Sequence, residues 1–393
     1  MSWGVRMQYK TIGEINHYAS ENVNPARFPE QYFELYSVPH FSEGHPEIIK
    51  GKDVGATKQV VQEGDVLICK INPRINRVWK VTRHTDYPLI ASSEWVIVRN
   101  ADLNADYLTY YFSSPKFRVL INSELTGMGG SLTRAQPKQI RRYPVPVPDK
   151  EEQHFVVRNL ALLDHLISLR HRQAEKLDEL VKARFVEMFG DPVLNCLHTE
   201  ACPMTEICQI IDGDRGKNYP KAEDFFDKGD CLFLNAKNVT KAGFDFEECM
   251  FITKDKDKVL RKGKLQRGDI ILTTRGTIGN LAFYTDDVPY SDIRINSGMV
   301  ILRMNSKYIN PIYFIEQFKM QLENIKRKIA NGTAQPQLPI STMNKIKVIV
   351  PDIRLQANFA NFVHEVDCEK ERIQRSAALL ETLKRSLMQQ YFG

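Results

Sequence analysis

The sequence repeats itself once, and this repeat limits the possible folds more than any other feature. Residues 61–68 (VQEGDVLI) align with residues 265–272 (LQRGDIIL), an offset of 204 residues. The same offset pairs Arg99 with Arg303. Self-similarity at such a long period indicates a duplicated structural unit and not a solenoid of short repeats. Each half of the chain is therefore predicted to form the same fold.

The register continues to the end of each half. After one deletion the offset becomes 203 residues, and residues 153–190 align without a gap with residues 356–393. Both aligned segments end in Phe-Gly and contain no internal Gly or Pro, as expected for a long helix. We therefore divide the chain into domain 1 (1–148), spacer helix 1 (149–190), domain 2 (191–351) and spacer helix 2 (352–393).

The two globular domains are predicted to be rich in strands. A Gly-Asp turn precedes a short apolar run in each, and residues 95–98 and 299–302 have the composition of neighbouring buried strands. Helices are expected at residues 105–112 and 311–329, the second with proline in its first turn. Each domain closes with a proline-containing strand that suits only a sheet edge. The predicted fold class is α+β.

The long helices carry a heptad pattern. Residues with alternating spacings of four and three form one seam, which includes long polar side chains such as Arg170 and Lys370 and is flanked by charges. A surface helix packed only on its own domain is the alternative, but two matching helices of this length favour pairing. The residues predicted to pair are Val156, Leu160, Leu163, Ile167, Leu177, Phe359, Val363, Val366, Ile373 and Leu380.

Connectivity predicts the direction of this pairing. Domain 2 is joined tightly to the end of the first helix and to the start of the second. A domain of this size is only about 40 Å across, so it cannot easily connect distant helix ends. We therefore expect an antiparallel coiled coil with a pseudo-twofold axis that relates the two halves.

Composition excludes several classes of protein. The chain is 42% hydrophobic and 26% charged, which is ordinary for a globular protein. Its apolar runs are far shorter than the roughly 20 residues of a membrane span, and its start does not resemble a secretory leader. The seven cysteines form no Cys-x-x-Cys pair, so no metal site is expected. We predict a cytoplasmic protein with reduced thiols.

Motifs for catalysis are missing from the sequence. There is no Gly-x-Gly-x-x-Gly fingerprint, and residues 213–218 have the wrong spacing for a phosphate loop. The chain also lacks His-Glu-x-x-His, Gly-x-Ser-x-Gly and the Asn/Asp-Pro-Pro-Tyr segment of amino-methyltransferases. We therefore predict no catalytic residue and no cofactor bound by this chain.

Basic and amide side chains cluster in loops at equivalent places of both halves. Residues 66–85 contain five Lys or Arg residues and no acidic residue, whereas the net charge of the whole chain is only +6. Arg, Asn and Gln can read base edges, and Lys, Ser and Thr suit phosphate. The predicted DNA-binding residues are Lys70, Arg74, Arg77, Lys80, Ser131, Thr133, Arg134, Gln136, Lys217, Asn218, Tyr219, Lys237, Asn238, Thr274, Arg275, Thr277, Thr333, Gln335 and Gln337.

With these features together, the chain resembles the specificity subunits of type I restriction-modification systems over essentially its whole length. The most specific matches are the junction at residues 145–153 (VPVPDKEEQ) and the helix end at residues 185–192. The second junction, residues 352–356 (DIRLQ), lacks the glutamate before the glutamine and is a weaker match. The surrounding residues nevertheless stay in register.

The resemblance implies a function and partners. Such subunits are non-catalytic; each recognition domain reads one half of an asymmetric bipartite DNA site, and the helix pair sets the spacer. Two methyltransferase subunits, which would bind S-adenosylmethionine, are expected to dock on the chain, and two restriction-translocase subunits can join. Two alternatives stay open: a specificity component of a nuclease-methylase fusion, and a non-enzymatic coiled-coil scaffold that binds proteins.

Overall fold

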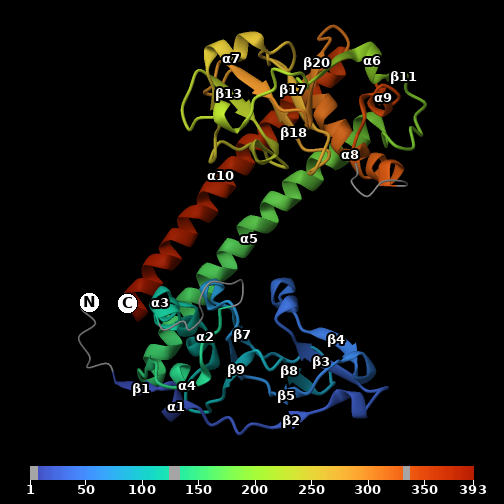
Figure 1. The fold of residues 1–393 in the computed structure, drawn as a ribbon. Coiled ribbons are helices and arrows are strands. Elements are labelled where there is room, and N and C mark those ends of the chain that lie inside the picture. The colour runs from blue at the N-terminus through green and yellow to red at the C-terminus, as the bar shows by residue number, and fades with distance from the viewer. Residues whose placement is uncertain (1–7, 124–132, 331–336) are drawn as a thin grey trace. The chain divides into compact units, whose positions relative to one another are not determined.

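A computed structural model describes residues 8–123, 133–330 and 337–393 (Figure 1). The chain forms two compact units: unit 1 comprises Met1–His171 and Gln374–Gly393, and unit 2 comprises Arg172–Ile373. Each unit thus combines a globular part with a portion of both long helices. Among the described residues, no helix is both long enough and apolar enough to cross a membrane.

The globular part of unit 1 is built from short strands with a few helices. Strands β2-β5-β8-β3-β4 form one sheet, β7-β6-β9 form another, and β1 pairs with β10. The main elements are β1 (Tyr9–Thr11), α1 (Ile12–Ile15), β2 (Asn22–Val23), β3 (Tyr32–Tyr36), β4 (Glu47–Lys50), β5 (Lys58–Val60), β6 (Val66–Cys69), β7 (Val78–Lys80), β8 (Leu89–Ala91), β9 (Trp95–Val98), α2 (Ala105–Ser113), α3 (Pro115–Ser123), α4 (Pro137–Ile140) and β10 (Pro144–Pro146).

Unit 2 repeats the same plan. Strand β17 lies between β18 and β20, as β6 lies between β7 and β9, and β11 pairs with β21 as β1 pairs with β10. The main elements are β11 (Ala201–Pro203), α6 (Met204–Ile207), β12 (Cys208–Asp212), β13 (Cys231–Leu234), the 3-10 turn η6 (Ala236–Asn238), β14 (Val239–Thr240), β15 (Gly243–Phe244), β16 (Phe251–Ile252), α7 (Lys254–Val259), β17 (Ile270–Thr273), β18 (Leu281–Phe283), β19 (Ile293–Ile295), β20 (Met299–Met304), α8 (Pro311–Ala330), α9 (Ile340–Met343) and β21 (Lys347–Ile349).

One strand distinguishes the two sheets. In unit 2, β12 pairs with β20 along its whole length. In unit 1 the corresponding chain keeps one backbone bond, from the His17 N–H to the Arg99 carbonyl (2.8 Å). A side chain also holds it, because the Asn16 amide donates to the Ile97 carbonyl (2.7 Å) and accepts from the Arg99 N–H (2.9 Å). A side-chain bond of this kind competes with ladder pairing. The duplicated sequence therefore yields two related sheets with different edges.

The repeated Gly-Asp dipeptide has a structural role in both units. Gly64 and Gly268 have φ angles of +88° and +89°, a conformation that glycine adopts without strain. The next residue caps the turn: the Asp65 carboxylate accepts from the Gln62 N–H at 2.9 Å, and Asp269 repeats this bond at 2.8 Å. This turn starts the central strand, β6 or β17, of each sheet.

The long helices α5 (Lys150–Phe189) and α10 (Ile353–Phe392) begin at equivalent buried glutamines. In unit 1 the Gln153 amide accepts from the Asn104 N–H at 2.8 Å, and in unit 2 Gln356 accepts from Asn310 N–H at 2.8 Å. Asn104 and Asn310 in turn cap α2 and α8. Each glutamine therefore fixes a long helix to a helix of its own globular part.

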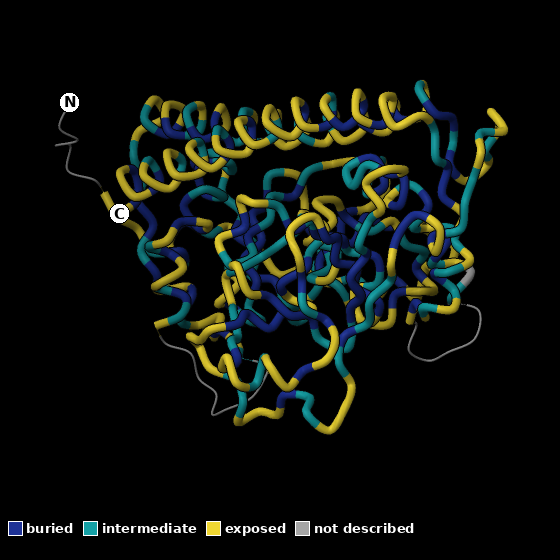
Figure 2. Tube along the Cα trace, turned by 90° about the horizontal axis from the view of Figure 1, so that it is seen from above, coloured by how far each residue is buried: buried dark blue, intermediate teal, exposed yellow. Residues whose placement is uncertain are grey.

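Within each unit the long helices run antiparallel, which confirms the predicted pairing. In unit 1 the first half of α5 packs with the end of α10, and Lys384 donates to Asp164. In unit 2 the end of α5 packs with the first half of α10, and Lys370 donates to Asp178 at 2.5 Å. Buried and exposed positions alternate along both helices (Figure 2).

Each hydrophobic core includes side chains from the far end of one long helix. Met388, Tyr391 and Phe392 of α10 belong to the core of unit 1, which is otherwise formed by its N-terminal residues. In unit 2, Phe185 and Phe189 of α5 belong to the core together with Phe359 and Tyr313. Aromatic rings of this size contribute much of a core's burial energy. Neither core is complete without both helices.

Candidate nucleic-acid interface

The structure brings together the two loop segments that were predicted to bind DNA, and it does so in both units. In unit 1 the loop after β6 meets the segment before α4 in an antiparallel bridge between Ile71 and Arg134. In unit 2 the loop after β17 meets the segment before α9 in a bridge between Arg275 and Gln337. The two bridges are equivalent in the repeat. We call each of them a loop pair.

Backbone hydrogen bonds hold these loop pairs. In unit 1 the Asn72 N–H donates to the Thr133 carbonyl, and the Ala135 N–H donates to the Lys70 carbonyl, both at 2.9 Å. In unit 2 the Leu338 N–H donates to the Thr274 carbonyl at 2.9 Å. The backbone is therefore fixed, and the side chains at the bridge are free to differ. Of the predicted contacts, Ser131, Thr333 and Gln335 lie outside the described residues.

The loop pair of unit 1 is bent by its own sequence. Asn72 and Asn76 adopt left-handed conformations, with φ of 49° and 50°, on either side of a short 3-10 turn that starts at Pro73. Asparagine tolerates this region better than other non-glycine residues. The turn leaves the Arg74 side chain exposed. Arg134, also exposed, donates to the Glu94 carboxylate at 3.0 Å.

The other basic candidates in unit 1 are tied more closely to the fold. Lys80 forms an ion pair with Asp106 of α2. Arg77 is half-buried, and its Nη1 has no hydrogen-bond partner in the described part of the chain. Lys70 is also half-buried, whereas Gln136 is exposed. Contact between these four side chains and DNA stays a prediction.

The loop pair of unit 2 presents a different set of side chains. Arg275, Thr277 and Gln337 are exposed. Thr274 is buried, and its hydroxyl donates to the Gly298 carbonyl at 2.9 Å, so it supports the loop. The Thr273 hydroxyl donates to the Thr277 carbonyl and closes the turn between them. The exposed arginine and glutamine at one bridge form a surface that can donate to and accept from base edges.

Asn238, which was predicted to bind DNA, is instead buried in the fold. It is 1% exposed; its amide donates to the carbonyls of Asp245 (3.0 Å) and Glu248 (2.8 Å), and accepts from the Asn235 N–H. The spacing Asn235-x-x-Asn238 is typical of a capped turn and was the available signal. Its neighbour Lys237 is exposed and pairs with Glu248.

The loop at residues 213–218 holds the remaining candidates. Lys217 is exposed, and the Asn218 amide donates to the Val259 carbonyl at 3.3 Å. Tyr219 packs edge-on against Phe233, with ring centroids 5.8 Å apart, and belongs to a small apolar cluster. Of the three, Lys217 is the one most accessible to a nucleic acid.

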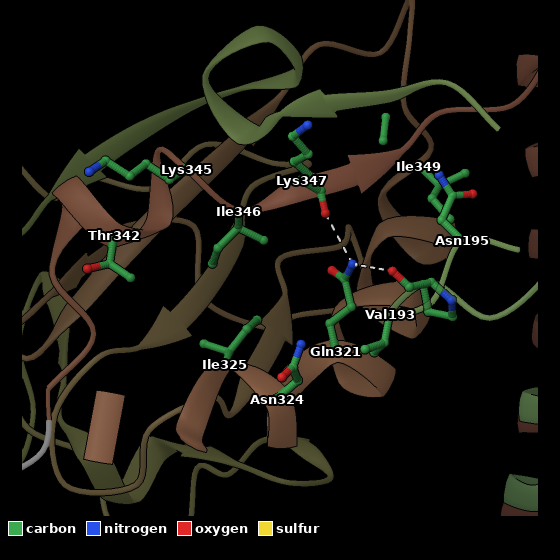
Figure 3. Close-up of a pocket in the computed structure, with 12 residues that line it drawn as sticks. Val193, Asn195, Gln321, Asn324, Ile325, Thr342, Lys345, Ile346, Lys347 and Ile349 are labelled. Atoms are coloured by element: carbon green, nitrogen blue, oxygen red, sulfur yellow. Dashed lines mark hydrogen bonds between the residues drawn. The ribbon is translucent and has the colours of Figure 1, made fainter. Parts of the chain in front are cut away.

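A cavity of about 440 Å³ lies elsewhere in unit 2, between α8, β21 and the segment after α5 (Figure 3). Gln321 is central to it: its amide donates to the carbonyls of Pro192 (2.9 Å) and Lys347 (3.1 Å), and its oxygen has no partner among the residues described. The cavity lining shares no residue with the loop pair. It is therefore not part of the candidate interface.

Metal-ligating side chains do not gather near the loop pairs. Within residues 8–123, 133–330 and 337–393, no group of three or more His, Cys, Asp or Glu side chains could hold a metal ion. The exposed side chains at the loop pairs offer hydrogen bonding and positive charge. Arg275 and Gln337 supply planar donors in one unit, and Arg134 supplies them in the other.

Comparison with known proteins finds related sequences. Residues 200–381 match the family described as the type I restriction modification DNA specificity domain. The MjaVIII type I restriction enzyme specificity subunit of Methanocaldococcus jannaschii is 22% identical over 378 residues, which cover 91% of this chain and 85% of the relative. By this match and this likeness, the chain resembles the specificity subunits of type I restriction-modification systems. Specificity subunits of these systems are non-catalytic components.

Solved structures show the same fold. The S subunit of a type I restriction-modification system from M. genitalium superposes with a TM-score of 0.52 at 15% identity, over 100% of this chain and 98% of that chain. A structure described as the basis of complex assembly and conformational transition of the type I R-M system gives 0.62 at 15% identity, over 100% and 99%. The predicted α+β fold with two long helices is confirmed.

Proposed function

We propose that the specificity subunit reads an asymmetric bipartite DNA site, with one half-site read by each unit. The observation that carries this proposal is the duplicated loop pair, which has one backbone arrangement and two sets of side chains. Unit 1 presents Arg134 beside Ile71, and unit 2 presents Gln337 beside Arg275. The same scaffold with different base-reading groups suits the recognition of two different sequences.

The antiparallel helices would set the distance between the half-sites. Domains that bind successive major grooves on one face of DNA are about 34–36 Å apart, one helical turn. Each long helix has 40 residues and is about 60 Å long, which accommodates this separation. The ion pairs Lys384–Asp164 and Lys370–Asp178 support the antiparallel register of the pair that acts as the spacer.

Two methyltransferase subunits, which bind S-adenosylmethionine, are the partners proposed for the helices and domains, and restriction-translocase subunits join where the system cleaves DNA. The place of action would be the cytoplasm. A partner that binds the long helices is supported by unit 1. There, apolar side chains that directly precede the residues of the helix-pairing seam remain accessible to solvent. We call them the apolar face, and its members are Phe155, Leu162, Leu166, Leu169, Leu379 and Leu383.

The apolar face points away from the globular part of its unit. Residues that directly follow a seam residue contact that part: Val157 packs on the core, and Asp164 accepts from the Tyr110 hydroxyl at 2.8 Å. Residues that precede seam residues lie on the opposite side of an antiparallel pair. Leu162 and Leu379 remain 55% and 72% exposed. An exposed apolar strip of this kind is typical of an interaction surface.

Methylation mapping tests the proposed function. A host lacking other methyltransferases would carry the specificity subunit with its methyltransferase, and modified adenines would be sequenced across the genome. We expect one asymmetric motif made of two short specified segments and a fixed unspecified spacer. A scaffold that binds proteins would leave the genome without any motif that depends on this chain. A specificity component of a nuclease-methylase fusion would give a motif only with the fusion protein.

A further inference from the structure

Two surface hollows lie beside the loop pair of unit 2. The first has a volume of about 730 Å³ and lies between η6, β14, the turn at residues 276–280 and α8. The second has a volume of about 530 Å³ and lies between residues 212–218 and residues 261–262. Both belong to one compact unit, so their positions relative to Arg275 are defined. Neither is large enough or closed enough to enclose a folded partner.

Arg275 lies between the hollows along a continuous path of contacts. Gly276, Thr277 and Ile278, which directly follow it, line the first hollow. On its other side Arg275 is adjacent to Gly298, where an added Cβ would be 3.8 Å from the Arg275 Cβ. The carbonyl of the preceding residue, Ser297, accepts from Arg215 of the second hollow at 3.3 Å.

The first hollow combines positive charge with an apolar floor. Lys237, Lys241 and Lys326 line it, and its lining contains no acidic residue. Two of the lysines pair with glutamates outside the lining, Lys237 with Glu248 and Lys326 with Glu323. Both of these ion pairs are exposed, and such pairs contribute little to stability, so an anion can replace the carboxylates. The floor is formed by Val239, Ile278 and Ile329.

The second hollow also has more basic than acidic side chains in its lining. Four basic residues line it with two acids, and both acids are already engaged. Asp212 pairs with Arg215 at 3.1 Å. Asp214 accepts from the backbone N–H of Arg261 (2.7 Å) and Gly216 (3.0 Å); although partial burial opposes it, these bonds lower the pKa of Asp214. The basic side chains at this hollow are Arg215, Lys217, Arg261 and Lys262.

We propose that the two hollows hold the sugar-phosphate backbone of one DNA strand on either side of the base-reading pair Arg275 and Gln337. Lysines and arginines would contact the phosphates, and deoxyribose would pack on the apolar floor of the first hollow. The proposal rests on DNA recognition by unit 2 and adds the path of the strand. It assigns a role to Lys241, Lys326, Arg261 and Lys262, which the sequence did not single out.

Salt dependence distinguishes phosphate contacts from base contacts. Each phosphate contact releases bound counterions, so log K falls as log[salt] rises. Removing one phosphate contact makes this negative slope shallower by about 1 unit. The specificity subunit, assembled with its methyltransferase, would be titrated with a duplex carrying its mapped site and with a scrambled duplex. The variants are Lys241→Gln/Lys326→Gln for the first hollow and Arg261→Gln/Lys262→Gln for the second.

A matched control separates local contacts from total charge. Lys228→Gln/Lys307→Gln removes the same charge from two exposed residues that line neither hollow. Lys241→Arg/Lys326→Arg keeps the charge of the first hollow. We expect each hollow variant to make the negative salt slope shallower by about 2 units for both duplexes. The control and the Arg variant should have the same slope as the wild-type complex.

Four results would decide against the strand path. Unchanged salt slopes in both hollow variants would overturn it. An equally reduced slope in the control, or a reduced slope in the Arg variant, would do the same. A change of sequence preference with an unchanged slope would show base contact in place of phosphate contact. If the wild-type complex bound neither duplex, the proposed function itself would fail. The strand path is supported if both hollow variants, but neither the control nor the Arg variant, have a shallower salt slope and an unchanged sequence preference.

Discussion

The Asp65 carboxylate accepts two hydrogen bonds from the Arg99 guanidinium, at 2.8 Å from Nε and 2.7 Å from Nη2. The pair links the turn before β6 to the end of β9, and the Asp65 side chain is fully buried. Asp269 and Arg303 repeat it in unit 2, with both distances at 2.8 Å. A two-pronged ion pair therefore fixes the sheet that carries the loop pair in each unit.

Asp65→Ala should destabilise unit 1 markedly. The change leaves the Arg99 guanidinium without its partner and removes the cap on the Gln62 N–H, so we expect a loss of about 3 kcal/mol. Urea unfolding of the purified chain measures it. Asp106→Ala is the matched control, because it breaks the more exposed pair with Lys80 and should cost less than about 1 kcal/mol. Equal losses would contradict a special role for the buried pair.

Arg275→Ala should change recognition at one half-site only. A planar guanidinium that contacts a guanine edge contributes about 1–3 kcal/mol of discrimination, so the variant should relax one position of the site by roughly 10- to 100-fold. Competition binding with single-substitution duplexes checks this. The half-site read by unit 1 serves as the internal control. An unchanged preference at every position would remove Arg275 from the base-reading residues.

Arg134→Ala should affect the other half-site. Because Arg134 is bonded to Glu94, the side chain is held in place before DNA arrives. Glu94→Gln keeps the shape but removes the charge, so it should weaken binding less than Arg134→Ala, whose loss should again be about 1–3 kcal/mol. The same set of substituted duplexes measures both. If Glu94→Gln alone abolished discrimination, the ion pair and not the arginine would be the determinant.

Shortening the paired helices should change the spacer. Deleting residues 171–174 and 374–377, four residues from the middle of each long helix, removes about one turn, or about 6 Å, from each helix. Methylation mapping should then show both half-sites unchanged and a different number of unspecified bases between them. Altered half-sites with a constant spacer would contradict the spacer role.

If two methyltransferase subunits dock on the chain as proposed, the apolar face of unit 1 predicts that they dock unequally. The equivalent positions of unit 2 are mostly charged or polar: Asn358, Glu365, Glu369, Arg372, Lys176 and Leu180. Leu162→Glu/Leu169→Glu should therefore weaken one of two docking events by at least about 100-fold, since burying each leucine contributes about 1.5–3 kcal/mol.

Native mass spectrometry of the assembled complex measures that effect. The variant should shift the population towards complexes with one methyltransferase subunit. Glu365→Ala/Arg372→Ala changes the equivalent positions of unit 2 and is the matched control, with a loss below about 1 kcal/mol. If both variants released subunits to the same extent, the apolar face would not be the stronger docking surface.

Sequence alone predicted the features that depend on periodicity. The helix expected at residues 105–112 is α2 (Ala105–Ser113), and the strand expected at residues 95–98 is β9. The proline strand at the end of domain 1 is β10, whose assigned partner is β1. These predictions succeed because hydrophobic pattern and proline geometry act locally.

The roles of individual polar residues were harder to predict. Asn238 and Thr274 have the same side-chain chemistry as exposed DNA-reading residues, yet both are buried and bonded to backbone carbonyls. The sequence predicts that Lys80 binds DNA, but the tertiary fold places Asp106 beside it and the two form an ion pair. Burial and long-range partners depend on the whole fold, so composition in a loop cannot reveal them.

The exchange of helix ends between the two cores has an evolutionary consequence. Phe392 of the unit 1 core is equivalent in the repeat to Phe189 of the unit 2 core. A single half of the chain could therefore fill its own core only with the helix of a second copy. Two identical half-length chains would complete one another as a symmetric dimer and read a palindromic site. Fusion of two such halves into one chain would leave each half free to diverge in the bases that it is proposed to read.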